Sequence, residues 1–201
     1  MSAAGLVLAA GAGRRFGGPK ALVRYGDELL VERAARTLSA AGCAPVLVVL
    51  GAEAATVART AELGDAVVVV NDGWPSGMGS SLSVGLSALA DLGAAGAVVL
   101  LVDQPHVSAE LVERLVAHWG DGVPAVSASY GGQRRNPVLL DASVWADVKA
   151  TATGDVGARV WLDTHADDVV LVACDDLGSA VDIDTPLDLE RLTHDSAEDR
   201  A

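Results

Sequence analysis

A glycine-rich segment near the N-terminus carries the residues whose types and spacing most clearly suggest chemistry. Residues 8–20, LAAGAGRRFGGPK, hold Arg14, Arg15 and Lys20 among their glycines, a local excess of positive charge in a chain of formal net charge −13. A glycine-rich turn between a strand and a helix presents backbone N–H groups to phosphates. Arginine adds a planar fork, and lysine adds a mobile point charge. The segment therefore predicts a triphosphate site, and the alternative is a solvated turn with surface cations.

Two common phosphate-binding patterns do not fit this segment. The dinucleotide fingerprint G-x-G-x-x-G fails by one position, because Gly11 and Gly13 are followed by Gly17. The Walker pattern fails because Pro19 directly precedes the lysine and Ala21 stands where a hydroxyl residue is required. The glycines and cations therefore predict a phosphate loop of another kind.

Apolar, β-branched segments alternate with helical patterns along almost the whole chain, and these elements must position the loop. The alternation implies right-handed βαβ units and a doubly wound, mostly parallel sheet, so residues 1–192 are predicted to form a single α/β domain. Ligands of such sheets bind at the carboxyl ends of the strands. Residues 193–201 are predicted to be a flexible acidic tail. The predicted strands are 5–10, 45–50, 66–70, 97–102, 125–129 and 136–140 (these two as a hairpin), 169–173 and 181–183, and the predicted helices are 29–41, 80–91, 108–119, 142–149, 155–164 and 186–192.

Composition and charge exclude several classes of protein. Hydrophobic residues make up 51% of the 201 residues and charged residues 20%, which excludes a disordered chain. The net charge of −13 argues against binding to nucleic acid and to anionic membrane surfaces. No segment approaches the roughly 18 apolar residues of a membrane span. Cys43 and Cys174 are too few for a disulfide framework, so a cytoplasmic protein with two buried thiols is expected.

Five motifs, in order along residues 5–192, resemble those of the MobA-like nucleotidyltransferases. In the first motif, LAAGxSxRxGxxK, Gly13 departs from the usual serine, which would remove a hydroxyl contact to phosphate. The other positions of that motif are filled by Leu8, Ala9, Ala10, Gly11, Arg15, Gly17 and Lys20. The second motif, NDGWPSGMGSSLSVGL at 71–86, resembles a segment of the molybdenum cofactor cytidylyltransferase branch. The third, VDQP at 102–105, resembles the D-x-P metal motif of the family. The last two are GDVGAR at 154–159 and DIDTPLDL at 182–189.

The resemblance implies a Rossmann-like nucleotidyltransferase fold and a Mg²⁺-dependent enzyme. Such an enzyme moves CMP from CTP to a phosphorylated acceptor such as molybdopterin, releases pyrophosphate, and has a molybdoenzyme as the partner that receives the cofactor. CTP is favoured over GTP because segment 71–86 and the Pro19–Lys20 pair look like the cytidylyl branch. Two alternatives stay open: an NAD(P)H-dependent oxidoreductase of the nicotine blue type, and a non-catalytic nucleotide-binding module that delivers a cofactor.

Asp103 is the metal ligand that the resemblance implies, and its place just after the most hydrophobic predicted strand suits that role. Mg²⁺ prefers one or two carboxylates together with phosphate oxygens. A second carboxylate is expected from Asp182 or Asp184, whose side chains point to opposite faces of a strand. Asp184 directly precedes Thr-Pro and is the better helix cap, so Asp182 is predicted to bind the metal.

The nucleotide is expected to contact the first loop and segment 71–86. Arg15 and Lys20 are predicted to clamp the triphosphate and to act in catalysis with Asp103, while Arg14 points to solvent. Candidates for contacts to the nucleotide base are Gly77, Ser80 and Ser81, with Asn71 as a residue that fixes the turn. The alternative for both serines is simple capping of the helix that follows.

The acceptor is expected to contact two arginines in the second half of the chain. Arg134 begins the segment RRNP, at a place where the family usually carries a glycine-containing turn. This departure would place an extra cation either beside an anionic acceptor or at the solvated tip of a hairpin. Arg159 lies in a motif that, by the resemblance, borders the acceptor pocket. Its alternative is an ion pair with Asp155, one helical turn away.

Overall fold

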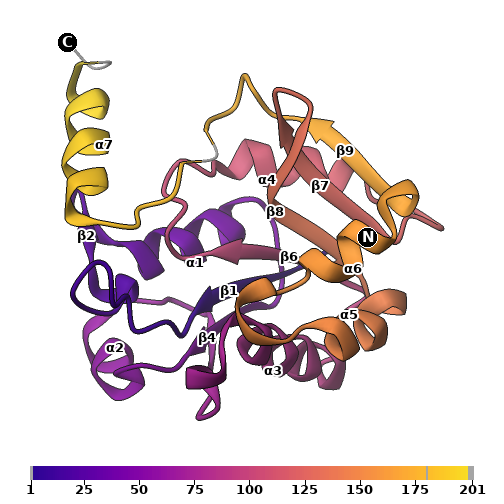
Figure 1. Ribbon diagram of the computed structural model, residues 1–201, viewed down its shortest axis with the longest axis horizontal. Helices are drawn as coiled ribbons and strands as arrows, with labels where there is room; N and C mark the ends of the chain where they lie inside the picture. The colour runs from indigo at the N-terminus through magenta and orange to yellow at the C-terminus, as the bar shows by residue number, and fades with distance from the viewer. Residues whose placement is uncertain (1, 180, 199–201) are drawn as a thin grey trace.

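A seven-stranded sheet forms the centre of the computed structural model, which describes residues 2–179 and 181–198 (Figure 1). The strand order is β5-β4-β1-β6-β8-β7-β9, and β8 is antiparallel to both neighbours while the other neighbouring pairs are parallel. This confirms the predicted mostly parallel sheet and its hairpin. The strands are β1 (Ala4–Ala9), β4 (Val46–Leu50), β5 (Val67–Val70), β6 (Gly96–Leu101), β7 (Ala125–Tyr130), β8 (Gln133–Asp141) and β9 (Val169–Ala173).

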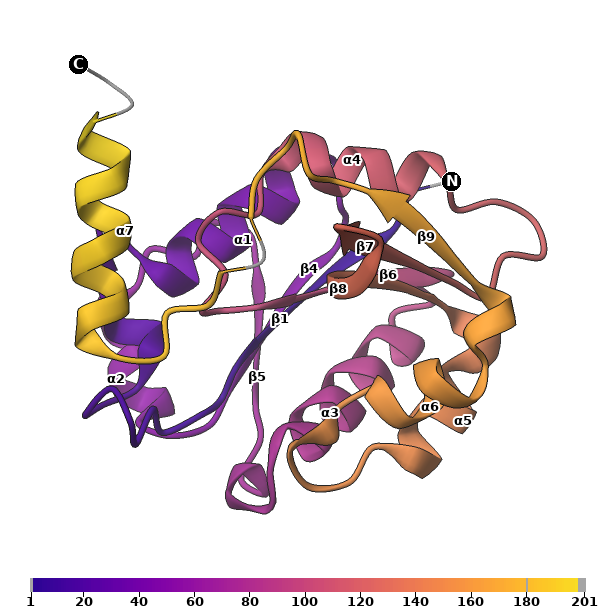
Figure 2. The same ribbon diagram turned by 45° about the horizontal axis from the view of Figure 1, so that its top comes forward.

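Helices cover both faces of this sheet, with α1 and α4 on one face and α3, α5 and α6 on the other (Figure 2). Along β1, Val7 and Ala9 pack into the first layer, and Leu6 and Leu8 pack into the second. Because both faces of the sheet are buried at its centre, β1, β4 and β6 are continuously apolar instead of alternating with polar residues. The helices are α1 (Leu30–Ala40), α2 (Ala54–Thr60), α3 (Met78–Asp91), α4 (Ala109–Ala117), α5 (Trp145–Thr151), α6 (Arg159–Thr164) and α7 (Pro186–Glu198).

Several short elements complete the chain between these helices and strands. A small antiparallel pair, β2 and β3, follows the glycine-rich loop, and the described part of the chain holds five 3-10 turns. Their bounds are β2 (Arg24–Tyr25), β3 (Glu28–Leu29), η1 (Lys20–Leu22), η2 (Trp74–Ser76), η3 (Ala142–Val144), η4 (Gly154–Val156) and η5 (Ala166–Asp168). No helix in the described part of the chain is long and apolar enough to cross a membrane.

Two helix predictions differ from the structure. Helix α3 begins at Met78 behind Gly77, so the prediction that Ser80 or Ser81 caps it is wrong, and both serines lie in its first turn. Gly77 takes a φ of 112°, which a residue with a side chain rarely adopts. Helix α2 was not predicted, because Val57 is its only buried residue and it has no apolar stripe.

The C-terminal segment also differs from its prediction. Residues 181–183 form no strand in the structure; instead, the Ile183 N–H donates to the backbone oxygen of Asp103 at 2.9 Å. Helix α7 continues to Glu198, so the predicted helix end at residue 192 is too early. The last three residues of the predicted tail, 199–201, lie outside the described residues.

Candidate active site

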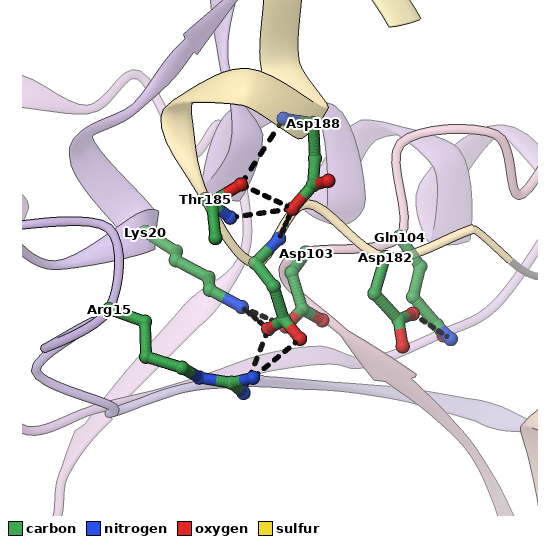
Figure 3. Close-up of polar contacts among 8 residues, drawn as sticks. Arg15, Lys20, Asp103, Gln104, Asp182, Thr185 and Asp188 are labelled. Carbon is green, nitrogen blue, oxygen red and sulfur yellow. Dashed lines mark hydrogen bonds and ion pairs between the residues drawn. The ribbon is translucent and has the colours of Figure 1, made fainter. Parts of the chain in front are cut away.

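The candidate site lies where β1 and β6 end, as expected for a parallel sheet. The glycine-rich loop leaves β1, and Asp103 stands just after β6. The hydrogen bond from Ile183 to the backbone of Asp103 fixes the C-terminal segment beside this strand end. Three stretches far apart in the sequence therefore bring their charged side chains together (Figure 3).

Lys20 lies at the centre of this cluster. Its Nζ donates to Asp103 Oδ2 and to Asp184 Oδ1, each at 2.7 Å, and its side chain is 14% exposed. Arg15 is largely exposed and contacts both oxygens of Asp184, at 3.0 and 3.1 Å. The other oxygen of Asp103, Oδ1, is buried and has no hydrogen-bond partner in the described part of the chain. A second cation could therefore bind Asp103 without displacing a protein group.

The opposite charges of Lys20 and Asp184 shift the pKa values of both groups so that each charged form is favoured. Burial by itself lowers the pKa of Lys20, but the neighbouring Asp103 and Asp184 outweigh it, and the pKa lies above its usual 10.5. The hydrogen bond from Lys20 in turn holds the pKa of Asp184 below its usual 3.8. Lys20 and Asp184 are thus both charged at neutral pH, and the hydrogen bond between them is charge-assisted.

Asp184 does not cap helix α7, so the prediction of that capping role is wrong. The Thr185 Oγ1 accepts from the N–H of Asp188 at 3.3 Å, and the Asp188 carboxylate accepts from the N–H of Thr185 at 2.8 Å. This reciprocal pair satisfies the helix N-terminus and leaves the Asp184 carboxylate free to pair with Lys20. The premise for choosing Asp182 over Asp184 as a metal ligand is therefore absent.

Asp182 has a different partner. The Nε2 of Gln104 donates to Asp182 Oδ1 at 2.9 Å (Figure 3). Partial burial raises the pKa of Asp182 above its usual 3.8, the Gln104 bond opposes that shift, and the charges of Asp103 and Asp184 add to it. The residue keeps an exposed surface, so its carboxylate remains open to solvent and ligands.

The glycine-rich loop is built around Gly13. The N–H groups of Phe16, Gly17 and Gly18 all donate to its carbonyl oxygen, at 2.9 to 3.2 Å. Its φ is 56°, and a Cβ at this position would lie 1.9 Å from the Gly18 oxygen. The serine usual in the family cannot fit this loop conformation. The N–H groups of residues 11–15 donate to no protein acceptor in the described part of the chain, so they are available to phosphates.

A pocket of about 550 Å³ opens at this loop, and we call it the first pocket. Most of the predicted catalytic and nucleotide-binding residues line it, but three do not: Ala9 packs into the opposite core layer, Gly17 shapes the loop, and Ser80 bonds within its own segment. Arg14, predicted to point to solvent, is exposed at its edge. The lining residues are Leu8, Ala10, Gly11, Ala12, Gly13, Arg14, Arg15, Lys20, Trp74, Pro75, Gly77, Met78, Ser81, Leu101, Val102, Asp103 and Asp155.

Asn71 organises the segment that closes one side of the first pocket. Its buried Nδ2 donates to the hydroxyls of Ser80 and Ser81 at 2.9 and 3.0 Å, and its Oδ1 accepts from the N–H of Gly73. This confirms its predicted turn-fixing role. A Cβ on Gly77 would lie 2.3 Å from the backbone of Gly154, so the two segments approach as closely as glycine allows.

A second pocket of about 350 Å³ adjoins the first and shares Leu8, Met78, Leu101 and Asp155 with it. Asp155 accepts from the N–H of Met78 at 3.3 Å and makes no bond to Arg159 within the described residues, so the alternative of a pair between them is wrong. Other lining residues include Gln104, Arg134, Arg135, Arg159 and Asp182. Sequence reasoning passed over Gln104, although it sits inside the VDQP motif.

Among the described residues, no group of three or more His, Cys, Asp or Glu side chains could hold a metal ion. A metal at Asp103 would therefore need ligand phosphates to complete its shell. That suits Mg²⁺, which usually binds one or two carboxylates plus phosphate oxygens. The unpaired Oδ1 of Asp103 and the nearby N–H groups of the loop fit such a metal–phosphate complex.

The chain is similar to two curated proteins over nearly its full length. A nicotine blue oxidoreductase from Paenarthrobacter nicotinovorans is 41% identical over 196 residues, covering 94% of this chain and 95% of that protein. A molybdenum cofactor guanylyltransferase from Cereibacter sphaeroides is 33% identical over 192 residues and covers 93% of each chain. Two relatives with different names therefore share this sequence pattern.

A solved structure supports the fold, and a family model identifies the family. The structure of Rv0371C from Mycobacterium tuberculosis H37Rv in complex with manganese superposes with a TM-score of 0.76 at 28% identity, covering 96% of this chain and 99% of that chain. The model of the MobA-like NTP transferase domain matches residues 5–175. The chain belongs to the MobA-like NTP transferase family.

Proposed function

We propose that this chain is a Mg²⁺-dependent nucleotidyltransferase with CTP as its donor. The observation that carries the proposal is the convergence of Arg15, Lys20 and Asp103 on the first pocket. Beside them lie the N–H groups of residues 11–15, which donate to no acceptor among the described residues. The volume of about 550 Å³ lies within the usual range of small-molecule sites. Cations and N–H donors suit the phosphates, and the Asp103 carboxylate would suit a divalent metal bound with them.

The proposed reaction is electrostatic and needs no general base. An acceptor oxygen bonds to the α-phosphorus, and the bond from that phosphorus to the bridging oxygen breaks to release pyrophosphate. A phosphate acceptor is largely deprotonated near neutral pH, since its second pKa is about 6. Arg15 and Lys20 would hold the leaving phosphates in line and neutralise their charge. The acceptor proposed from the resemblance is molybdopterin, with a molybdoenzyme receiving the product.

Nucleotidyltransferases of this family generally use a divalent metal. When bound, the metal supplies positive charge to the phosphate oxygens around the reacting phosphorus. Asp103 is the proposed ligand, together with one carboxylate of the C-terminal segment. Asp182 stays the sequence-based choice, while Asp184 is the carboxylate that shares the Lys20 ammonium with Asp103. Comparison of Asp182→Asn with Asp184→Asn in Mn²⁺ binding measured with CTP present separates the two.

CTP is proposed because segment 71–86 resembles the cytidylyl branch, whereas one relative is named a guanylyltransferase. A second candidate function follows from the other relative, an oxidoreductase that is 41% identical over nearly the whole chain. The missing dinucleotide fingerprint argues against that reaction here. A non-catalytic module that delivers a cofactor would bind a nucleotide in the same pocket but release no pyrophosphate.

A panel of thermal unfolding measurements tests these candidates. CTP, GTP, ATP, NADH and NADPH are each added with and without Mg²⁺, and we expect CTP with Mg²⁺ to raise the melting temperature most. Asp103→Asn should remove the Mg²⁺-dependent part of that rise, and Asp65→Asn, at an exposed carboxylate outside both pockets, should keep it. Stabilisation by NADPH alone would overturn the proposal, and stabilisation by GTP alone would replace the donor. Pyrophosphate release with CTP and a molybdopterin acceptor then excludes the delivery module.

A further inference from the structure

Arg15 and Lys20, the two cations assigned above to the phosphates, share an acidic partner within the chain. Arg15 contacts both oxygens of Asp184, at 3.0 and 3.1 Å, and Lys20 Nζ contacts Asp184 Oδ1 at 2.7 Å. A carboxylate that engages both terminal nitrogens of an arginine uses the same fork with which arginine binds a phosphate. Asp184 therefore competes with phosphates for a cation that lines the first pocket.

Basic and acidic side chains balance within this cluster. Two are basic, Arg15 and Lys20, and two are acidic, Asp103 and Asp184. A polyphosphate is attracted most strongly by cations that no carboxylate already neutralises. The pair of Lys20 with Asp103 is the more buried one, whereas Arg15 is 74% exposed and Asp184 36% exposed. Exposed ion pairs contribute little stability, so phosphates can replace Asp184 at Arg15 at small cost.

The backbone that carries Asp184 is anchored on both sides. Before it, the buried Ile183 donates its N–H to the backbone oxygen of Asp103 at 2.9 Å. After it, the Asp188 carboxylate accepts from the N–H of Asp184 itself at 3.2 Å. Arg15, by contrast, is a long and largely exposed side chain on the glycine-rich loop. An exchange of partners therefore requires movement of the Arg15 side chain, while the C-terminal segment stays in place.

We propose that Asp184 is an internal counter-ion that sets the affinity of the first pocket for phosphate groups. Asp184 holds the Arg15 guanidinium at the pocket and releases it when the phosphates of a ligand reach the loop. Because Asp184 acts on the ligand through Arg15, it is a positioning residue. The inference rests on the nucleotidyl transfer proposed above, in which Arg15 and Lys20 hold the leaving phosphates.

The same competition helps pyrophosphate to leave. As the product departs, Arg15 returns to Asp184, and the regained ion pair offsets part of the lost phosphate contacts. Product release limits the turnover of many enzymes. Asp184→Asn is therefore expected to strengthen inhibition by pyrophosphate.

Binding of inorganic tripolyphosphate in the presence of EDTA tests the competition without metal, nucleotide base or turnover. Isothermal titration calorimetry measures it on the full chain at low ionic strength, where charge interactions are least screened. Asp184→Asn removes the charge but keeps the size of the side chain, and we expect it to bind tripolyphosphate about fivefold more tightly. Asp184→Ser removes the same charge and should show the same gain, so the test survives if the asparagine variant unfolds.

Asp182→Asn is the matched control. It removes an equal charge two positions away, from a carboxylate that accepts from the Gln104 amide and forms no ion pair among the described residues. Its effect on tripolyphosphate affinity therefore measures the loss of negative charge alone, and we expect a gain of less than about twofold.

A double variant shows whether the gain acts through Arg15. In an Arg15→Gln chain, Asp184→Asn should improve tripolyphosphate binding by no more than about twofold. Three results would each overturn the inference: equal gains for Asp182→Asn and Asp184→Asn, a fivefold gain that persists without Arg15, or no tripolyphosphate binding to the Asp184→Asn chain. Failure of the proposed function has a different signature, because CTP with Mg²⁺ would then release no pyrophosphate although tripolyphosphate affinity still responds to Asp184→Asn.

Discussion

Lys20→Met tests whether the ion-pair cluster organises the first pocket. Methionine keeps an unbranched chain of similar length but removes both hydrogen bonds of 2.7 Å. Hydrogen bonds to charged groups contribute about 1.5–3 kcal/mol each when buried. The Asp184 side chain is 36% exposed and keeps Arg15, so the bond to Asp184 contributes little. Asp103, by contrast, loses the only side-chain partner that it has among the described residues. We therefore expect Lys20→Met to lower the free energy of unfolding by about 2 kcal/mol at pH 7.

The loss of stability in Lys20→Met should depend on pH, because the pKa values of Lys20 and Asp184 are both shifted in the folded protein. Because Lys20 lowers the pKa of Asp184, that part of the stabilisation is present above pH 3.8 and disappears as pH falls through the lowered value. The pKa of Lys20 itself is raised, so its contribution is present below pH 10.5 and disappears as pH rises through the raised value. The difference between the variant and the unmodified chain should be largest between these limits.

Urea unfolding at several pH values measures this difference directly. For a chain of this size, about 2 kcal/mol corresponds to a fall in melting temperature of about 4–8 °C. Arg59→Gln, at a surface arginine outside both pockets, should shift neither quantity. A Lys20→Met effect that is below about 0.5 kcal/mol, or that stays constant down to strongly acidic pH, would refute the role assigned to the cluster.

Three further predictions concern the loop, the C-terminal helix and the thiols. Gly13→Ser should destabilise the fold by about 1–3 kcal/mol, because φ at Gly13 is 56° and a Cβ there would lie 1.9 Å from the Gly18 carbonyl oxygen. Thermal unfolding measures this, with Gly11→Ser as the control, because a Cβ on Gly11 meets nothing within 4 Å. Thr185→Val removes the hydroxyl that accepts from the Asp188 N–H and should cost about 1 kcal/mol in urea unfolding. Burial raises the pKa of Cys43 to about 11, so a thiol-specific dye at pH 8 should leave it unlabelled until the chain is unfolded.

The sheet and the place of the site could be predicted because both depend on local patterns. Apolar runs such as 97–102 indicate buried strands, and the ends of parallel strands meet at one edge of a sheet. Lys20 and Asp103 were therefore predicted to share a site, and Lys20 Nζ lies 2.7 Å from Asp103 Oδ2. Both cysteines are free and buried, as predicted.

What could not be predicted depends on partners far away in the sequence. Asp184 was assigned to helix capping because a carboxylate before Thr-Pro is a good local cap, but the reciprocal pair formed by Thr185 already satisfies that helix end. Its actual partner, Lys20, lies 164 positions away. Arg134 presents the same problem, because nothing near it in sequence indicates the ion pair with Asp163.

The end of strand β6 supplies both pockets at once. Asp103 lines the first pocket, and the next residue, Gln104, lines the second and holds Asp182 at its side. Residues 102 and 103 form a turn in which the Gln104 N–H donates to the Leu101 oxygen at 3.3 Å, so the turn after β6 can face two neighbouring ligands. In a nucleotidyl transfer the acceptor oxygen must meet the α-phosphorus at the boundary of the two ligands. Leu101 lines both pockets, and Asp103 follows it by two residues in the first pocket, where a metal would neutralise charge on the reacting phosphate. Variation in the second pocket would then change the acceptor while the donor chemistry of the first pocket stayed the same.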